Sequence, residues 1–81
     1  MGKIISLPLS QMKMKQKGII VQIAGGRGLS SRLEAMGIRT GNEITKVSSM
    51  LMAGPVVIKA GNTEIALGYG MAQKIMVEVN E

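Results

Sequence analysis

The chain has 81 residues with no Cys, no His and a single aromatic residue, Tyr69. A chain of this length holds one hydrophobic core, so we expect residues 1–81 to form a single domain. Without Cys or His, the chain lacks the ligands of thiolate zinc sites and iron–sulfur clusters and the usual general base at neutral pH, which argues against an enzyme. The formal net charge of +5 suits an anionic partner, but it does not choose between nucleic acid, anionic lipid and an acidic protein face.

Apolar runs stay far shorter than the roughly 20 residues that span a bilayer, and the N-terminus lacks the apolar stretch of a signal peptide. We therefore expect a cytoplasmic protein. The eight Met residues do not replace the missing metal ligands, because a thioether is a soft ligand that suits Cu(I). We expect them to fill the core, because a flexible thioether adapts to irregular gaps.

The N-terminal segment is expected to be extended. Lys3 to Leu9 is largely apolar, and the alternation Met12-Lys13-Met14-Lys15 predicts an extended chain with one face against the body. Pro8 favours an edge strand or a turn. A basic amphipathic membrane anchor is the alternative interpretation, but Pro8 and Gly18 leave too little helix between them.

A strand and a short helix follow. The apolar residues on one side of this first clear strand are Ile19, Val21 and Ile23. The apolar stripe of the helix, at positions i, i+4 and i+7, consists of Leu29, Leu33 and Met36. Gly25-Gly26 ends the strand, and we expect the helix to begin near Gly28. Gly37 is the expected left-handed stop, after which Ile38 folds back onto the last turn.

The rest of the chain predicts four more strands, at about Glu43–Met50, Val56–Lys59, Glu64–Leu67 and Ile75–Val79. Arg39 to Asn42 and Gly61-Asn62 are typical of tight turns, and Gly68 to Ala72 of a turn or a single-turn helix. Ile44 and Val47 share a face only if their strand contains a bulge. About five short strands with one small helix after the first predict a mainly β fold. We expect a closed or nearly closed antiparallel barrel, because closure hides the edges of a small sheet.

Four stretches of the chain carry a family resemblance. The longest, Gly28 to Gly41, contains an Arg-Leu, a Met-Gly-Ile and a final Gly, with Met36 where Leu is usual. Gly54-Pro55-Val56, Ile65 to Gly68 and Ala72 to Val77 follow at matching intervals. In this order and spacing they resemble the FeoA domain.

The resemblance implies an SH3-like barrel. A free-standing FeoA domain is similar to the small cytosolic partner of FeoB, a bacterial ferrous iron transporter with a cytosolic GTPase region. The same domain also ends iron- and manganese-responsive repressors, but no helix-turn-helix precedes the barrel here, so we expect the free-standing form. The resemblance therefore implies a non-enzymatic accessory protein of ferrous iron uptake. Its expected partners are the cytosolic region of FeoB or a second copy of the chain, with contact to the membrane only through the transporter.

The chemistry of the chain gives no reason to expect a metal or a cofactor. A ferrous site needs several oxygen or imidazole ligands at one point. The carboxylates fall on separate predicted elements or at the chain end: Glu34, Glu43, Glu64, Glu78 and Glu81. No imidazole is present to activate a Ser, and a Lys would need deep burial to act as a base. Gly25 to Gly28 is glycine-rich but lacks the Lys-Ser/Thr ending of a phosphate loop.

Surface recognition remains as the mechanism. Three consecutive large apolar residues between two strands cannot all point inward, so we expect part of Met50-Leu51-Met52 to be exposed as a contact site, although a plug over the barrel end is an equal alternative. The arginines around the helix could orient an acidic partner. The chain lacks the aromatic walls of a proline-peptide groove. The candidate partner-binding residues are Met50, Leu51, Met52, Arg27, Arg32, Arg39 and Tyr69.

Two other functions stay open. Lys17 to Val21 followed by Gly25 resembles the opening of a KOW-type, nucleic-acid-binding barrel, and the positive charge suits phosphate contacts. Only Tyr69 could stack on a base, so we do not expect nucleic acid as the partner. The second alternative is a regulatory barrel associated with a metal-dependent repressor.

Overall fold

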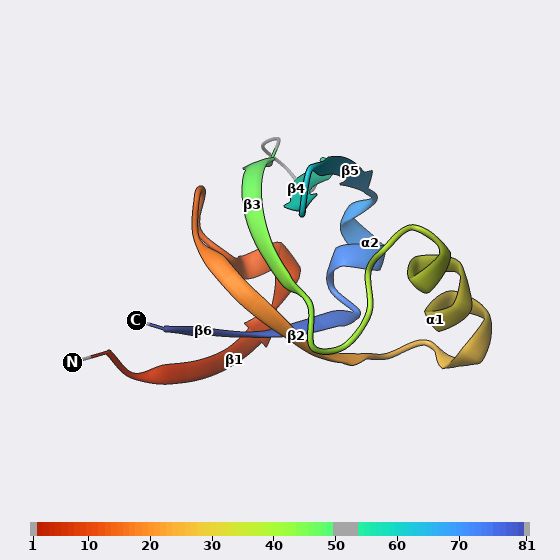
Figure 1. Ribbon diagram of the computed structural model, residues 1–81, viewed down its shortest axis with the longest axis horizontal. Coiled ribbons are helices and arrows are strands. Elements are labelled where there is room, and N and C mark those ends of the chain that lie inside the picture. Colours follow the sequence, from red (N-terminus) through yellow and green to blue (C-terminus); the bar gives the residue numbers. More distant parts are fainter. Residues whose placement is uncertain (1, 50–53, 81) are drawn as a thin grey trace.

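The computed structural model describes residues 2–49 and 54–80 (Figure 1). Six strands, two helices and a single 3-10 turn make up this part of the chain. In order they are β1 (Ile4–Pro8), η1 (Leu9–Gln11), β2 (Lys17–Ile23), α1 (Gly26–Ala35), β3 (Glu43–Ser49), β4 (Val56–Ala60), β5 (Thr63–Leu67), α2 (Tyr69–Ala72) and β6 (Ile75–Asn80).

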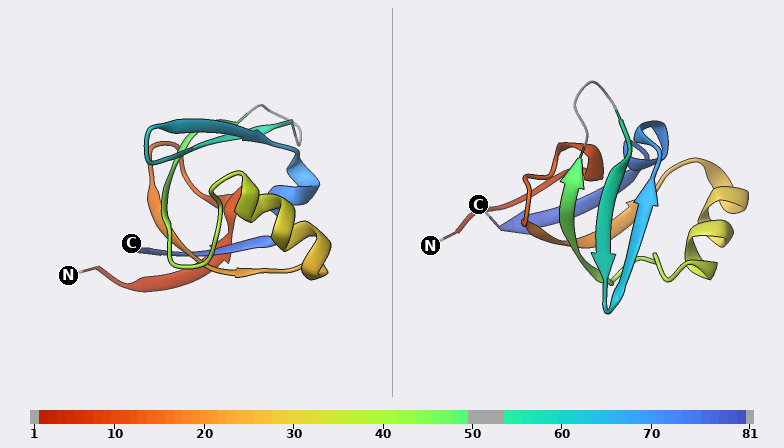
Figure 2. Two further views of the ribbon diagram at one scale, coloured as in Figure 1. Left: turned by 45° about the vertical axis from the view of Figure 1, so that its right-hand side comes forward. Right: turned by 90° about the horizontal axis from the view of Figure 1, so that it is seen from above.

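All six strands form one antiparallel sheet in the order β1-β6-β2-β3-β4-β5. The last strand lies between the first two, and Ile4 pairs with Asn80, so the two ends of the described chain lie side by side. Figures 1 and 2 show β3, β4 and β5 curling over β1, β6 and β2, with α1 projecting at one side. Within the described residues the pairing runs from β1 to β5 without joining these two edges.

The expected mainly β, SH3-like fold is confirmed, with one more strand than expected. The extra strand is β1, which is the predicted extended N-terminal segment. It lies at the sheet edge and ends at Pro8. An edge position suits proline, because proline has no amide hydrogen to donate to a neighbouring strand. Counting β1, the helix α1 follows the second strand and not the first.

The core is almost entirely aliphatic and is supplied by every strand except β1 and by both helices, while Ile5 and Leu7 of β1 are partly buried against it. Its buried members are Leu9, Met12, Ile20, Leu33, Ile38, Ile44, Val56, Ile58, Ile65, Leu67, Ala72, Ile75, Val77 and Val79. Each fully buried Val, Leu or Ile contributes about 1.5–3 kcal/mol relative to an exposed position. The alternation predicted for the last strand is confirmed, since Ile75, Val77 and Val79 all point inward.

The inward face of β2 differs from the one that the sequence pattern suggested. Ile20 is fully buried, whereas Ile19 and Val21 are each 38% exposed. The register with β6 shifts between Ile20 and Gln22, so a bulge at Val21 interrupts the alternation. The prediction that Ile19, Val21 and Ile23 lie on one side of a regularly alternating strand was therefore wrong, because the bulge at Val21 interrupts the alternation.

The bulge predicted in β3 is confirmed, because its register with β4 shifts between Lys46 and Ser48. The end of α1 also follows the prediction. Gly37 has a φ of 89°, and the amide of Ile38 donates to the carbonyl of Leu33 at 2.9 Å. The start does not, because α1 begins at Gly26 and not near Gly28.

Candidate docking surface

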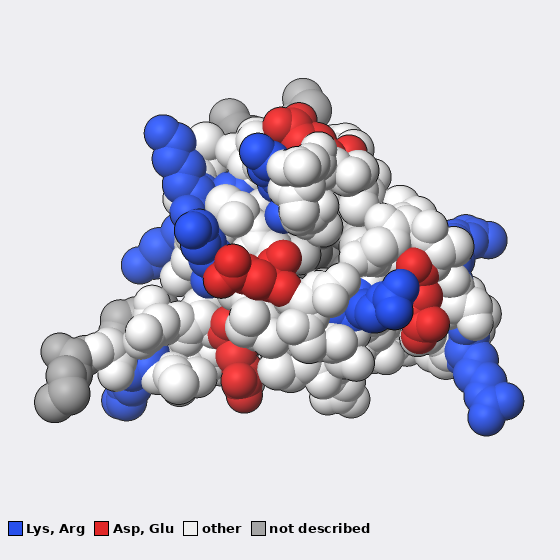
Figure 3. All heavy atoms as spheres, viewed as in Figure 1, with Lys and Arg blue, Asp and Glu red and all other residues white. Residues whose placement is uncertain are grey.

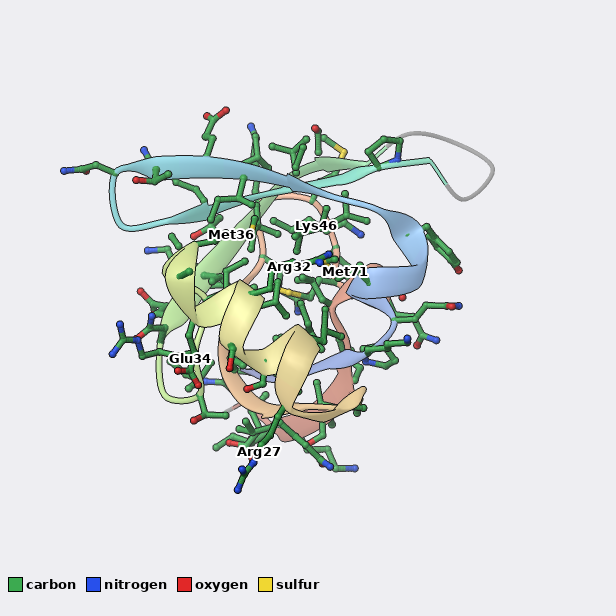
Figure 4. All side chains as sticks on the ribbon, turned by 90° about the vertical axis from the view of Figure 1, so that its right-hand side faces the viewer. Arg27, Arg32, Glu34, Met36, Lys46 and Met71 are labelled. Atoms are coloured by element: carbon green, nitrogen blue, oxygen red, sulfur yellow. The ribbon has the colours of Figure 1, made fainter. Side chains whose placement is uncertain are left out.

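The arginines predicted to act together do not form one patch. Arg27 and Arg32 both lie on α1 and are exposed, but five residues at 3.6 per turn place them about 140° apart around the helix. Figure 4 shows them on opposite sides of α1, with Arg32 on the side of Met71 of α2. Arg39 is exposed beyond the end of the helix. The side chains of Arg27 and Arg32 therefore do not face one common direction.

The predicted apolar stripe of α1 is shorter than expected. Leu33 is fully buried and Leu29 is partly buried against the core, but Met36 is 40% exposed. The helix ends at Ala35, so the backbone of Met36 already departs from helical geometry. Met36 thus belongs to the surface, on the same side of α1 as Arg32 (Figure 4).

The remaining predicted contact residues are placed only in part. Tyr69 begins α2 and is half-buried. Met50, Leu51 and Met52 lie outside the described residues. In residues 2–49 and 54–80, no pocket is present, and His, Cys, Asp or Glu side chains nowhere gather in threes as a metal site needs. Neither helix of this part of the chain has the length and apolar character needed to cross a membrane.

Sequence reasoning missed a buried lysine. Lys46, on β3, is only 4% exposed, and its ammonium donates to the main-chain oxygens of Met12 at 2.6 Å and Ser10 at 3.2 Å. Burial lowers the pKa of Lys46 because desolvation disfavours the charged form. The signal was in the sequence: strict alternation places residue 46 on the same face as Ile44, which is in the core.

The backbone of Lys46 binds the same segment. Its amide donates to the oxygen of Gln16 at 3.0 Å, and its own oxygen accepts from the amide of Lys15 at 2.7 Å. Side chain and main chain together fasten residues 10–16 to β3. We call residues 12–17, which connect η1 to β2 and include its first residue, the lysine loop.

The lysine loop is a turn and not the extended segment that its alternation suggested. The main-chain amide of Gln16 donates to the main-chain oxygen of Lys13 at 3.1 Å. In return, the main-chain amide of Lys13 donates to the side-chain oxygen of Gln16 at 2.9 Å. Lys15 has a φ of 66°, in the left-handed region. The reversal buries Met12 and leaves Met14 61% exposed, so the two methionines do not share a face.

Comparison with known proteins settles the family. The model of the FeoA domain matches residues 7–79, nearly the whole chain. The chain belongs to the FeoA family. A candidate Fe(2+) transport protein A of Methanocaldococcus jannaschii is 38% identical over 71 residues, which cover 88% of this chain and 84% of that protein.

Solved structures agree with the FeoA assignment. The crystal structure of an iron uptake regulatory protein, FeoA, is 37% identical, with a TM-score of 0.82 over 93% of this chain and 99% of that one. A manganese-dependent transcriptional repressor also matches, with a TM-score of 0.83 over 98% of this chain but only 44% of the repressor. At 18% identity, that match shows a shared FeoA-type fold alone.

Proposed function

We propose that this FeoA-family chain is a small cytosolic accessory protein of ferrous iron uptake. It acts by binding the cytosolic region of a FeoB-type transporter and not by catalysis. The observation that carries this proposal is the FeoA match over residues 7–79, together with a relative of similar length that is named for Fe(2+) transport.

The partner-binding surface that we propose lies on the side of α1 that carries Arg32. Met36 adds an exposed apolar side chain there, and Met71 of α2 lies on the same side (Figure 4). An exposed methionine suits a contact that must adapt to its partner, and an arginine offers a planar donor to an acidic residue. Met50, Leu51 and Met52 remain the proposed apolar part of the contact, and Tyr69 and Arg39 its proposed rim.

Binding to the purified cytosolic region of the FeoB-type transporter from the same organism tests this proposal, with isothermal calorimetry as the readout. Arg32→Glu should weaken binding at least tenfold, because reversing a charge at an interface replaces an attraction by a repulsion. Replacing Leu51 and Met52 together by Ser should do the same through loss of apolar contact.

Arg27→Glu is the matched control. It makes the same charge change on the same helix, but on the opposite side (Figure 4). Binding should stay within about twofold of wild type, because a rim charge away from the contact acts only through long-range attraction. A wild-type chain that does not bind the transporter region would overturn the proposed function. Equal losses for Arg27→Glu and Arg32→Glu would overturn the proposed surface.

A further inference from the structure

The lysine loop combines positive charge with an exposed apolar side chain. Lys13, Lys15 and Lys17 are all exposed, and Met14 between them is 61% exposed. The first acidic residue of the chain is Glu34, so the preceding 33 residues carry only positive charge. Figure 3 shows blue spheres along the side of the molecule where Figure 1 places the start of β2.

The exposure of Met14 is built into the fold. The ammonium of Lys46 holds the oxygens of Ser10 and Met12 from inside, and the main chain of Lys46 holds Lys15 and Gln16. The loop therefore cannot turn Met14 into the core, where Met12 already lies. A fixed loop loses little conformational freedom when it binds, which favours its use as a contact site.

We propose that the lysine loop is a contact site for an anionic lipid surface. Met14 enters the boundary between headgroups and acyl chains, and Lys13, Lys15 and Lys17 bind the phosphate groups around it. This is a rigid loop and not the amphipathic helix that Pro8 and Gly18 exclude. The site does not depend on the proposed transporter contact, because α1 takes no part in it.

The side chains of the loop favour lipid over nucleic acid or protein. A thioether at the tip cannot stack on bases, and the only aromatic residue, Tyr69, belongs to α2. All the cations of the loop are lysines, whose long apolar stems lie in the interface while the ammonium stays in water. Arginine, which is preferred for paired contacts to phosphate in nucleic acids and carboxylate in proteins, is absent from the loop.

The neighbouring sheet limits the contact to the loop. Two residues along β2 from Lys17, exposed Ile19 pairs with Glu78 of β6 on one side and with Glu43 of β3 on the other. These carboxylates would be repelled by anionic headgroups. Lys59, two strands away from Lys17 in the sheet, is directly opposite Glu64, so a negative charge lies beside that lysine as well. The protein therefore touches the lipid surface with the lysine loop, and the outer face of the sheet does not lie against the lipid.

Co-sedimentation of the full chain with vesicles tests the proposal. Vesicles of phosphatidylcholine alone are compared with vesicles that also contain phosphatidylglycerol. The wild type should bind only the anionic vesicles, and binding should fall with added salt. Met14→Asp should reduce binding at least tenfold, and so should Lys13→Gln with Lys17→Gln, because each lysine near the surface contributes separately.

The control removes the same charge elsewhere. Arg27→Gln with Lys74→Gln also lowers the net charge by two, but Lys74 lies at the far end of β2, where its oxygen accepts from the amide of Ala24 at 2.7 Å. Vesicle binding should stay within about twofold of wild type. Equal binding to both kinds of vesicle, or an equal loss in this control, would overturn the proposal. Tight binding of polyuridine that Lys13→Gln with Lys17→Gln abolishes, without binding of the wild type to anionic vesicles, would assign the loop to nucleic acid and overturn the proposal as well.

Discussion

Among the described residues, the exposed arginines of α1 and the lysine loop are positioned by different means. The arginines of α1 are placed by helical periodicity, so their directions follow from the sequence once the buried position of Leu33 is known. The lysine loop is placed by Lys46, whose sequence distance to Met12 is 34 residues. The comparison teaches that a local pattern fixes the first surface, whereas a long-range contact fixes the second. Changes at the contact should therefore act on the loop and leave α1 in place.

Replacing Lys46 should have the largest effect on stability. Lys46→Ala leaves the buried oxygens of Ser10 and Met12 without a donor and opens a cavity beneath the loop. We expect the free energy of unfolding to fall by about 2–4 kcal/mol, as measured by urea denaturation. Vesicle binding should also fall, although no exposed charge is removed.

Lys59→Ala is the matched control on the adjacent strand. Lys59 is exposed, and its loss should change the free energy of unfolding by less than about 0.5 kcal/mol. Similar losses for the two variants would contradict the claim that the buried ammonium holds the loop.

Gly18→Val should have the next largest effect on stability. Gly18 lies in β2 directly after the lysine loop, so this substitution also acts on the region of the loop and not on α1. A Cβ at Gly18 would meet Val79 Cγ1 at 3.0 Å, the oxygen of Glu78 at 3.2 Å and Met12 Cε at 3.3 Å. The neighbouring strand cannot move away without losing its pairing with β2. We expect a loss of about 1–3 kcal/mol in the free energy of unfolding, measured by thermal denaturation.

A glycine substitution in α1, Gly28→Ala, should instead raise the free energy of unfolding. A Cβ at Gly28 meets nothing within 4 Å, so Gly28→Ala adds helix propensity without a clash. We expect a gain of about 0.5–1 kcal/mol. A gain for Gly18→Val would show that the close approach around Gly18 is not as described, and a loss for Gly28→Ala would contradict the open space around Gly28.

The smallest expected effect is a dependence of stability on pH. The pKa of Lys46 is lowered by burial, so between that lowered pKa and the ordinary lysine value the unfolded chain binds more protons than the folded one. The free energy of unfolding should therefore rise with pH across this window. Subtracting the profile of Lys46→Met isolates this rise from the other titrating groups. A difference profile that falls with pH would contradict the desolvation of Lys46.

The sequence was sufficient for most of the fold, because local signals dominate there. The stop at Gly37, the bulge in β3 and the hairpin at Gly61-Asn62 follow from backbone preferences and alternation, and all three are present. The resemblance to FeoA domains added the barrel type. The partner-binding roles of the arginines and of Met50 to Met52 stay predictions.

Other features depend on tertiary contacts that no local pattern encodes. The inward position of Ile20 is set by its pairing with β6 and by the bulge that follows it. The turn at Lys15 is held by β3, which is remote in sequence. Lys46 was passed over because a lysine within a strand is normally solvated, although its alternation with Ile44 pointed inward.

The most direct test of the account is binding of the full chain to the cytosolic region of the FeoB-type transporter in the absence of lipid. The account predicts a saturable one-to-one complex that Arg32→Glu weakens and Met14→Asp leaves unchanged. The absence of a complex, or equal weakening by both substitutions, would contradict it.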